Sequence, residues 1–124
     1  MLSFTSCRFF GSMNAAKGVT LAKIAGKARV SFSHCYYCPW DAGLNGGKTV
    51  IHAQGGRLGI TDCTFINRLP ASSKPAPQIV LEPDVQSAII TANEFYGPGT
   101  ISNQSQGKVQ IANNIERTDS GPRA

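Results

Sequence analysis

The chain has 124 residues, of which 41% are hydrophobic and 15% charged, and its formal net charge is +5. This balance fits one folded domain and excludes a highly charged disordered chain. The apolar runs are far shorter than the roughly 20 residues of a membrane span, and no Lys/Arg tract is present, so we expect neither a membrane nor a nucleic acid as partner.

The residues after Met1 lack the charged region, apolar core and cleavage site of a signal peptide. A complete repeat unit follows at once, without the polar capping unit that repeat arrays normally carry at their ends. The protein is thus either cytoplasmic or a piece of a longer protein, and we expect the second, with this chain forming the C-terminal coils.

Five similar units follow one another along the chain, each predicted to begin with a leading strand. The leading strands are expected at residues 2–10, 29–37, 57–66, 87–96 and 108–115, and second strands at 19–22, 49–53, 78–81 and 100–102. Their apolar residues alternate with polar ones, and Gly and Pro separate them, as expected for strands. Residues 1–115 are thus predicted to form the coils, and residues 116–124 a polar tail.

Each unit contains two apolar residues two positions apart, then an anchor residue three positions later. The anchors are Cys7, Cys35, Cys63, Asn93 and Asn114, spaced by 28, 28, 30 and 21 residues. A period of this size indicates stacked supersecondary units. Corresponding strands are expected to pair in parallel from coil to coil. One inward column should then hold Phe4, Phe32, Ile60, Ile90 and Ile111.

The segments 60–65, 90–95 and 111–114, in which Ile precedes a Cys or Asn anchor by three positions, resemble the pectate lyase-like superfamily. That superfamily includes polysaccharide lyases, glycoside hydrolases and phage tailspikes. The resemblance implies an all-β, right-handed, single-stranded parallel β-helix (a solenoid) of about five coils. It also implies an extracellular or cell-surface location. The residues themselves indicate no cofactor, and calcium enters only through this resemblance.

In this superfamily an asparagine stands at a sharp bend between two strands, and such residues stack as a ladder. Asn tolerates the left-handed backbone region, and its amide can bond its neighbours. Asn93 and Asn114 fit this pattern. Cys suits the left-handed region poorly, so at the three Cys anchors either the bend is relaxed or the thiols stack inward.

The cysteines allow several interpretations. Cys35 and Cys38 form the only closely spaced pair, and a zinc site usually needs a second pair or clustered histidines. We therefore expect no metal site. Adjacent coils are about 4.8 Å apart, so a Cys7–Cys35 or Cys35–Cys63 disulfide remains open. The sequence leaves the redox state of all four cysteines undetermined.

No catalytic residue can be assigned. Residues 42–49 loosely match a phosphate-binding loop, but a strand follows instead of the helix that this loop requires. His34 and His52 belong to no nucleophile motif, and His52 is expected to point outward. No two carboxylates form the pair that glycoside hydrolysis needs.

The edge where the connections vary in length is the predicted carbohydrate-binding site. Aromatic rings stack on the apolar faces of sugars, and Lys or Arg pairs with uronate carboxylates. The residues gathered there are Tyr36, Trp40, Asp41, Lys48, Arg68 and Lys74.

The function expected is that of a β-helix module that binds or supports a polysaccharide, acidic glycans in particular, without catalysis of its own. One alternative is a structural or adhesive segment of a tailspike-like surface protein, which self-associates through exposed coil ends. The other alternative is a complete polysaccharide lyase.

Overall fold

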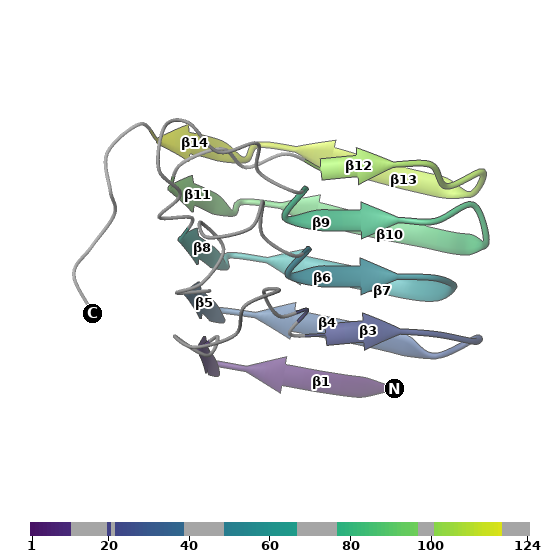
Figure 1. Ribbon diagram of the computed structural model, residues 1–124, viewed down its shortest axis with the longest axis horizontal. Helices are drawn as coiled ribbons and strands as arrows, with labels where there is room; N and C mark the ends of the chain where they lie inside the picture. Colours follow the sequence, from purple (N-terminus) through teal and green to yellow (C-terminus); the bar gives the residue numbers. More distant parts are fainter. Residues whose placement is uncertain (11–19, 21, 39–48, 67–76, 97–100, 118–124) are drawn as a thin grey trace.

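The computed structural model describes residues 1–10, 20, 22–38, 49–66, 77–96 and 101–117. Their regular secondary structure is entirely β-strand, in three parallel sheets (Figure 1). The chain visits the three sheets in turn and then returns to the first, one strand further along the stack. The expectation of an all-β fold with parallel stacked strands is confirmed, and the arrangement fits a parallel β-helix or solenoid.

Sheet A contains β1 (Leu2–Thr5), β4 (Arg29–Ser33), β7 (Gly56–Thr61), β10 (Val85–Thr91) and β13 (Lys108–Ala112). Sheet B contains β2 (Arg8–Phe10), β5 (Tyr36–Cys38), β8 (Thr64–Ile66), β11 (Glu94–Tyr96) and β14 (Ile115–Arg117). Sheet C contains β3 (Ala22–Ile24), β6 (Ile51–Ala53), β9 (Ile79–Leu81) and β12 (Ile101–Asn103). β14 extends two residues beyond the expected end of the coils at residue 115.

Each predicted leading strand is in fact two strands, one in sheet A and one in sheet B. A single residue with positive φ lies in the bend between them. These residues are Ser6, His34, Asp62, Ala92 and Asn113, with φ between 54° and 59°. All five are exposed. One left-handed residue turns the chain sharply, so the sequence alternation continues while the sheet changes.

The ladder comparison predicted a left-handed backbone at the anchors Asn93 and Asn114, and this prediction is wrong. The left-handed residue is the one before each anchor, Ala92 or Asn113. The reason is geometric: the preceding residue takes the strained conformation and points outward, which leaves the anchor side chain directed into the coil. The thiols of Cys35 and Cys63 accordingly stack inward and are 2% and 1% exposed.

The second strand of the first unit also differs from the prediction. It is β3, Ala22–Ile24, rather than residues 19–22, and residues 19 and 21 lie outside the described part of the chain. Pairing with β6 decides this register, because Ala22 lies beside Ile51 and Ile24 beside Ala53. Ile24 is buried in that arrangement. The other second strands agree with the prediction to within two residues at each end.

Stacked columns of side chains fill the interior, and two of them contain the large aromatic residues of sheets A and B. In the first, strand pairing places Phe4, Phe32, Ile60, Ile90 and Ile111 side by side, as the repeat pattern predicts. The second is an aromatic stack of Phe9, Tyr37, Phe65 and Phe95, with successive ring centroids 4.9, 4.7 and 4.9 Å apart. These distances match the spacing of neighbouring strands, so the parallel register itself creates the stack.

The anchor column is a ladder of hydrogen bonds between coils. Asn93 is fully buried, and its Nδ2 donates to the carbonyl oxygen of Ile60 at 3.0 Å. Its Oδ1 accepts the backbone N–H of Cys63 at 2.8 Å. In the next coil, Asn114 repeats the pattern by donating Nδ2 to the carbonyl of Ile90 at 3.0 Å.

The cysteine anchors continue this ladder with a different donor. The Sγ of Cys63 lies 3.4 Å from the carbonyl oxygen of Thr61 in its own coil and 3.6 Å from that of Phe32 in the preceding coil. The Sγ of Cys35 lies 3.4 Å from the carbonyl oxygens of both Ser33 and Phe4. In every case the inter-coil acceptor lies three residues before the anchor of the preceding coil. Cys therefore takes the place of the Asn amide as donor, but it shares one weak S–H between an inter-coil and an intra-coil carbonyl.

Candidate ligand-binding face

The outer face of sheet A is built from side chains that alternate with the buried columns. Burial alternates along β7 and β4 in the manner of half-buried strands. Short hydroxyl side chains dominate the outward positions, namely Ser3, Thr5, Ser31, Ser33, Thr61, Ser87 and Thr91. These side chains give the face many hydrogen-bonding groups.

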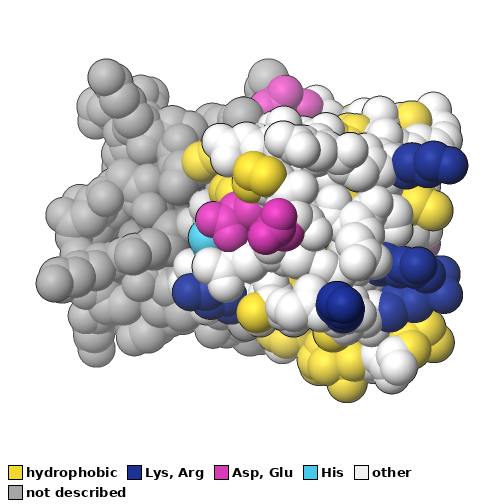
Figure 2. Space-filling view, turned by 90° about the vertical axis from the view of Figure 1, so that its right-hand side faces the viewer, with side chains coloured by type: hydrophobic (Ala, Val, Ile, Leu, Met, Phe, Trp, Pro, Cys, Tyr) yellow, Lys and Arg dark blue, Asp and Glu magenta, His cyan; other side chains and the backbone are white. Residues whose placement is uncertain are grey.

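A row of basic residues runs across the strands of this face. Strand register places Arg29 beside Arg57, Arg57 beside Ser87, and Ser87 beside Lys108. Arg29, Arg57 and Lys108 are exposed, and none of the three forms an ion pair with another described residue. Figure 2 shows Lys and Arg side chains gathered along the right-hand edge of the described surface. We call Arg29, Arg57 and Lys108 the basic row.

Like charges directly opposite each other on neighbouring strands are unfavourable. Arg29 and Arg57 are in this position, on strands about 4.8 Å apart. Neither has a carboxylate partner in the described part of the chain, so a bound anion would relieve their repulsion. Guanidinium groups in such a pair can each make two parallel hydrogen bonds to a carboxylate or phosphate.

A shallow depression of about 200 Å³ lies beside the basic row. Its lining includes Arg29 and Arg57, and also Gly59, where the row of outward side chains is interrupted. Ser31 and Ile89, on the two strands that flank Gly59, line it as well. Ile89 is 53% exposed. The depression thus combines positive charge, a hydroxyl group and an apolar surface.

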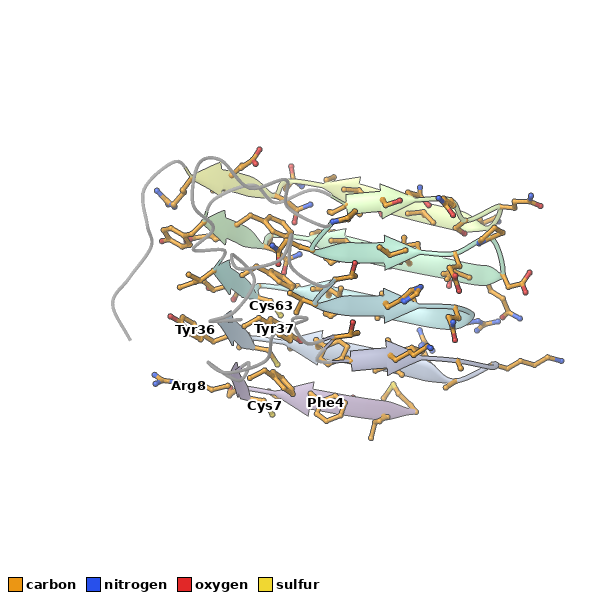
Figure 3. The ribbon with its side chains drawn as sticks, viewed as in Figure 1. Phe4, Cys7, Arg8, Tyr36, Tyr37 and Cys63 are labelled. Atoms are coloured by element: carbon orange, nitrogen blue, oxygen red, sulfur yellow. The ribbon has the colours of Figure 1, made fainter. Side chains whose placement is uncertain are left out.

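Of the carbohydrate-binding residues predicted from the sequence, only Tyr36 is in the described part of the chain. Trp40, Asp41, Lys48, Arg68 and Lys74 lie outside the described residues. Figure 3 shows Tyr36 and Arg8 extending from the outer side of sheet B, while Tyr37 and Cys63 lie within the stack. The guanidinium carbon of Arg8 lies 5.8 Å from the centroid of the Tyr36 ring. Arg8 therefore covers part of the ring that sugar stacking would use.

The two histidines form pairs with carboxylates. His34 Nε2 lies 2.8 Å from Asp62 Oδ2, and both side chains are mostly exposed in the bend between sheets A and B. His52, in sheet C, points outward as predicted, and its Nε2 lies 3.4 Å from Glu82 Oε1. Among the described residues, no group of three or more His, Cys, Asp or Glu side chains could hold a metal ion.

The described thiols of Cys7, Cys35 and Cys63 are free, and that of Cys63 is poorly suited to nucleophilic chemistry. Burial raises the pKa of the Cys63 thiol to about 12. Burial, followed by the neighbouring Cys63 and Cys35 thiols, also raises the pKa of Tyr37 above its usual value. A thiol in this setting stays protonated near neutral pH and is inert. The column thus serves the core and the inter-coil ladder.

The basic row was not predicted from the sequence, because its three members are 28 or more residues apart along the chain. The repeat register contains the signal, however: Arg29, Arg57 and Lys108 each lie six residues before an anchor. Gly59 lies four residues before Cys63. Once the anchors are aligned, positions that share an offset must share a row on the same face.

The fold and this face describe a parallel β-stack of repeated coils with a basic, hydroxyl-rich outer surface. No protein-family model matches the chain, and no curated protein or solved structure does so. The described part of the chain contains no helix whose length and apolar character would allow it to cross a membrane.

Proposed function

We propose that the chain is a right-handed parallel β-helix module of the pectate lyase-like kind, which binds an acidic polysaccharide outside the cell or at its surface. In Figure 1 the strands of sheet C lie in front and run to the right, while those of sheet A run to the left behind them. Each successive coil lies above the preceding one in this view. This sense of winding supports right-handedness.

The basic row is the observation that carries the proposed binding. Arg29, Arg57 and Lys108 repeat along the stack without carboxylate partners among the described residues, and hydroxyl groups surround them. A linear polyanion laid along the stack would meet cations from several coils. Its hydroxyl groups would find donors and acceptors in the Ser and Thr side chains.

A polysaccharide fits this face better than a nucleic acid. Single-stranded nucleic acids are usually held by aromatic platforms on which bases stack, and the described outer positions of sheet A contain no aromatic residue. Duplex binding relies on many phosphate contacts, whereas the row supplies three cations. An acidic polysaccharide carries carboxylates separated by hydroxyl-bearing rings. It therefore offers partners both for the Arg side chains and for the Ser or Thr side chains of this face.

The experiment is titration calorimetry with oligogalacturonate, comparing the unchanged protein with Arg57→Glu and Lys23→Glu. A charged hydrogen bond contributes about 1.5–3 kcal/mol, so Arg57→Glu should weaken binding by about 10-fold or more. Lys23 is exposed on β3 of sheet C. Its replacement makes the same change in net charge on another sheet and should change affinity by less than about 2-fold.

Two results would refute the proposal. The first is an unchanged protein that does not bind the oligomer. The second is an equal loss of affinity in both variants, which would mean that net charge alone attracts the glycan. Displacement of the glycan by DNA at equal charge concentration would instead favour a nucleic-acid ligand.

A second candidate function is self-association through the N-terminal coil. Met1 and Leu2 are 89% and 55% exposed, and a hollow beside β1 is lined by Leu2, Phe4 and Ile24. At the other end of the aromatic stack, Glu116 lies beside Phe95, so a charged residue follows the rings there. Sedimentation velocity at several concentrations tests this function. Self-association that Leu2→Glu abolishes would support it, and a monomer at every concentration would exclude it.

A further inference from the structure

Gly59 stands in the middle of the outer face, where a strand would normally carry a side chain. A glycine inside a strand weakens it and often marks a close approach by a ligand or another part of the backbone. Its neighbours in register are Ser31 on β4 and Ile89 on β10. Gly59 is thus the gap between two side chains in one row.

The described fold gives no internal reason for this glycine. Its φ lies outside the left-handed region, and an added Cβ would meet only Ser31 Oγ at 3.9 Å and Ser31 Cβ at 4.0 Å, which is ordinary contact. Gly56, three residues earlier on the same strand, is different. It has φ +77°, and a Cβ there would lie 2.2 Å from the carbonyl oxygen of Ala28. The backbone therefore requires glycine at position 56 but not at position 59.

The surroundings of Gly59 have the chemistry of a uronic acid. Arg29 and Arg57 supply two guanidinium groups to the lining of the depression. Ser31 offers a hydroxyl group, and Ile89 offers an exposed apolar surface. A uronic acid ring has an apolar C–H face, several hydroxyl groups and one carboxylate. A side chain at position 59 would occupy the space above the strand where such a ring could lie flat.

We propose that Gly59 is the floor of a uronate subsite and determines its specificity. The sugar ring lies over Gly59 with its C–H face towards Ile89, and its carboxylate binds Arg57 and Arg29. The polymer runs along the stack, across the strands, so that its next units approach the neighbouring coils. This subsite rests on the proposed function and specifies which sugar class that function recognises.

The test replaces Gly59 by Val, and separately by Ala, in the full chain. Both replacements should fold, because the space at Cβ is open and strands favour β-branched residues. The melting temperature should be unchanged or higher. Binding of trigalacturonate should weaken by about 10-fold for Gly59→Val and less for Gly59→Ala, because a larger side chain fills more of the floor.

Ser102→Val is the control, because Ser102 is a half-buried residue of β12 in sheet C, outside the proposed binding face, and does not line the depression. It adds no volume over the floor and should leave affinity within about 2-fold. A neutral trisaccharide should bind the unchanged protein at least about 10-fold more weakly than trigalacturonate, since it lacks the charge for Arg57.

The outcomes separate the subsite from the proposed function. Normal affinity in a folded Gly59→Val, with affinity lost in Arg57→Glu, would overturn the subsite and leave the polysaccharide function standing. Equal binding of the neutral trisaccharide would overturn the uronate specificity. Absence of binding by the unchanged protein would overturn both. Selective loss in Gly59→Val with unchanged melting temperature would support the subsite.

Discussion

Replacement of Asn93 tests whether Cys and Asn are interchangeable parts of one ladder. Asn93→Ala removes the acceptor of the buried Cys63 N–H and the donor to the buried carbonyl of Ile60. Each unsatisfied group costs about 1–3 kcal/mol. The free energy of unfolding should therefore fall by about 4 kcal/mol, a large part of the roughly 5–15 kcal/mol of a typical domain.

Asn93→Cys should be milder. A thiol at this position would have the carbonyl of Ile60 as an inter-coil acceptor, as Cys63 has Phe32 and Cys35 has Phe4, and would share its single S–H with a carbonyl of its own coil. It would replace the amide oxygen only as a weak acceptor for the Cys63 N–H. The expected loss is about half that of Asn93→Ala, or about 2 kcal/mol.

Urea unfolding followed by far-ultraviolet circular dichroism measures both losses. A change in stability shifts the midpoint and leaves the slope unchanged. Gln110→Ala is the control, because Gln110 is an exposed polar residue of β13 and its loss should change stability by less than about 0.5 kcal/mol. The reasoning fails if Asn93→Ala costs less than about 1 kcal/mol, or if Asn93→Cys is as damaging as Asn93→Ala.

Two further predictions concern the interior. Phe65→Ala should lower the free energy of unfolding by about 3–5 kcal/mol, because the ring is 1% exposed and stacks on Tyr37 and Phe95; a loss below about 1.5 kcal/mol in urea unfolding would contradict the stack. The Cys63 pKa, raised from 9.0 to about 12 by burial, means that the unfolded chain loses this proton first. The contribution of Cys63 to stability should therefore be constant below about pH 8 and fall by about 1.4 kcal/mol per pH unit between pH 9 and 12, with the raised pKa of Tyr37 adding to the decline. Thermal melts across this range should show a smaller decline for Cys63→Ala, and an equal decline in both proteins would exclude Cys63 as its source.

The repeat register could be read from the residues alone because every coil meets the same local requirement. Alternating apolar residues predict strands, and the constant offset between Ile60 and Cys63, or Ile90 and Asn93, predicts which side chains share a column. Parallel stacking then follows, since corresponding strands are the available partners of this length and pattern. The inward column from Phe4 to Ile111 was obtained in this way.

The predicted position of the left-handed bend was one residue too late, because the residue type with the higher propensity for positive φ is not the residue that stands at the bend. Asn tolerates positive φ better than Ala, and yet Ala92 takes that conformation while Asn93 points inward. Two inter-coil hydrogen bonds of Asn93, to Cys63 and Ile60, outweigh the preference of a single residue. Because such bonds join residues about 30 positions apart, the pattern of neighbouring residues in the sequence does not indicate them.

The residues by themselves determined that this chain is made of stacked β-coils, because repetition and alternation are properties of the order of the side chains. Only the tertiary structure decided where a ligand could bind. Arg29, Arg57 and Lys108 are isolated charges along the chain, and coil stacking brings Arg29 beside Arg57 and places Lys108 two strands further along the same row. The open space above Gly59 likewise exists only because Ser31 and Ile89 come to lie on either side of it.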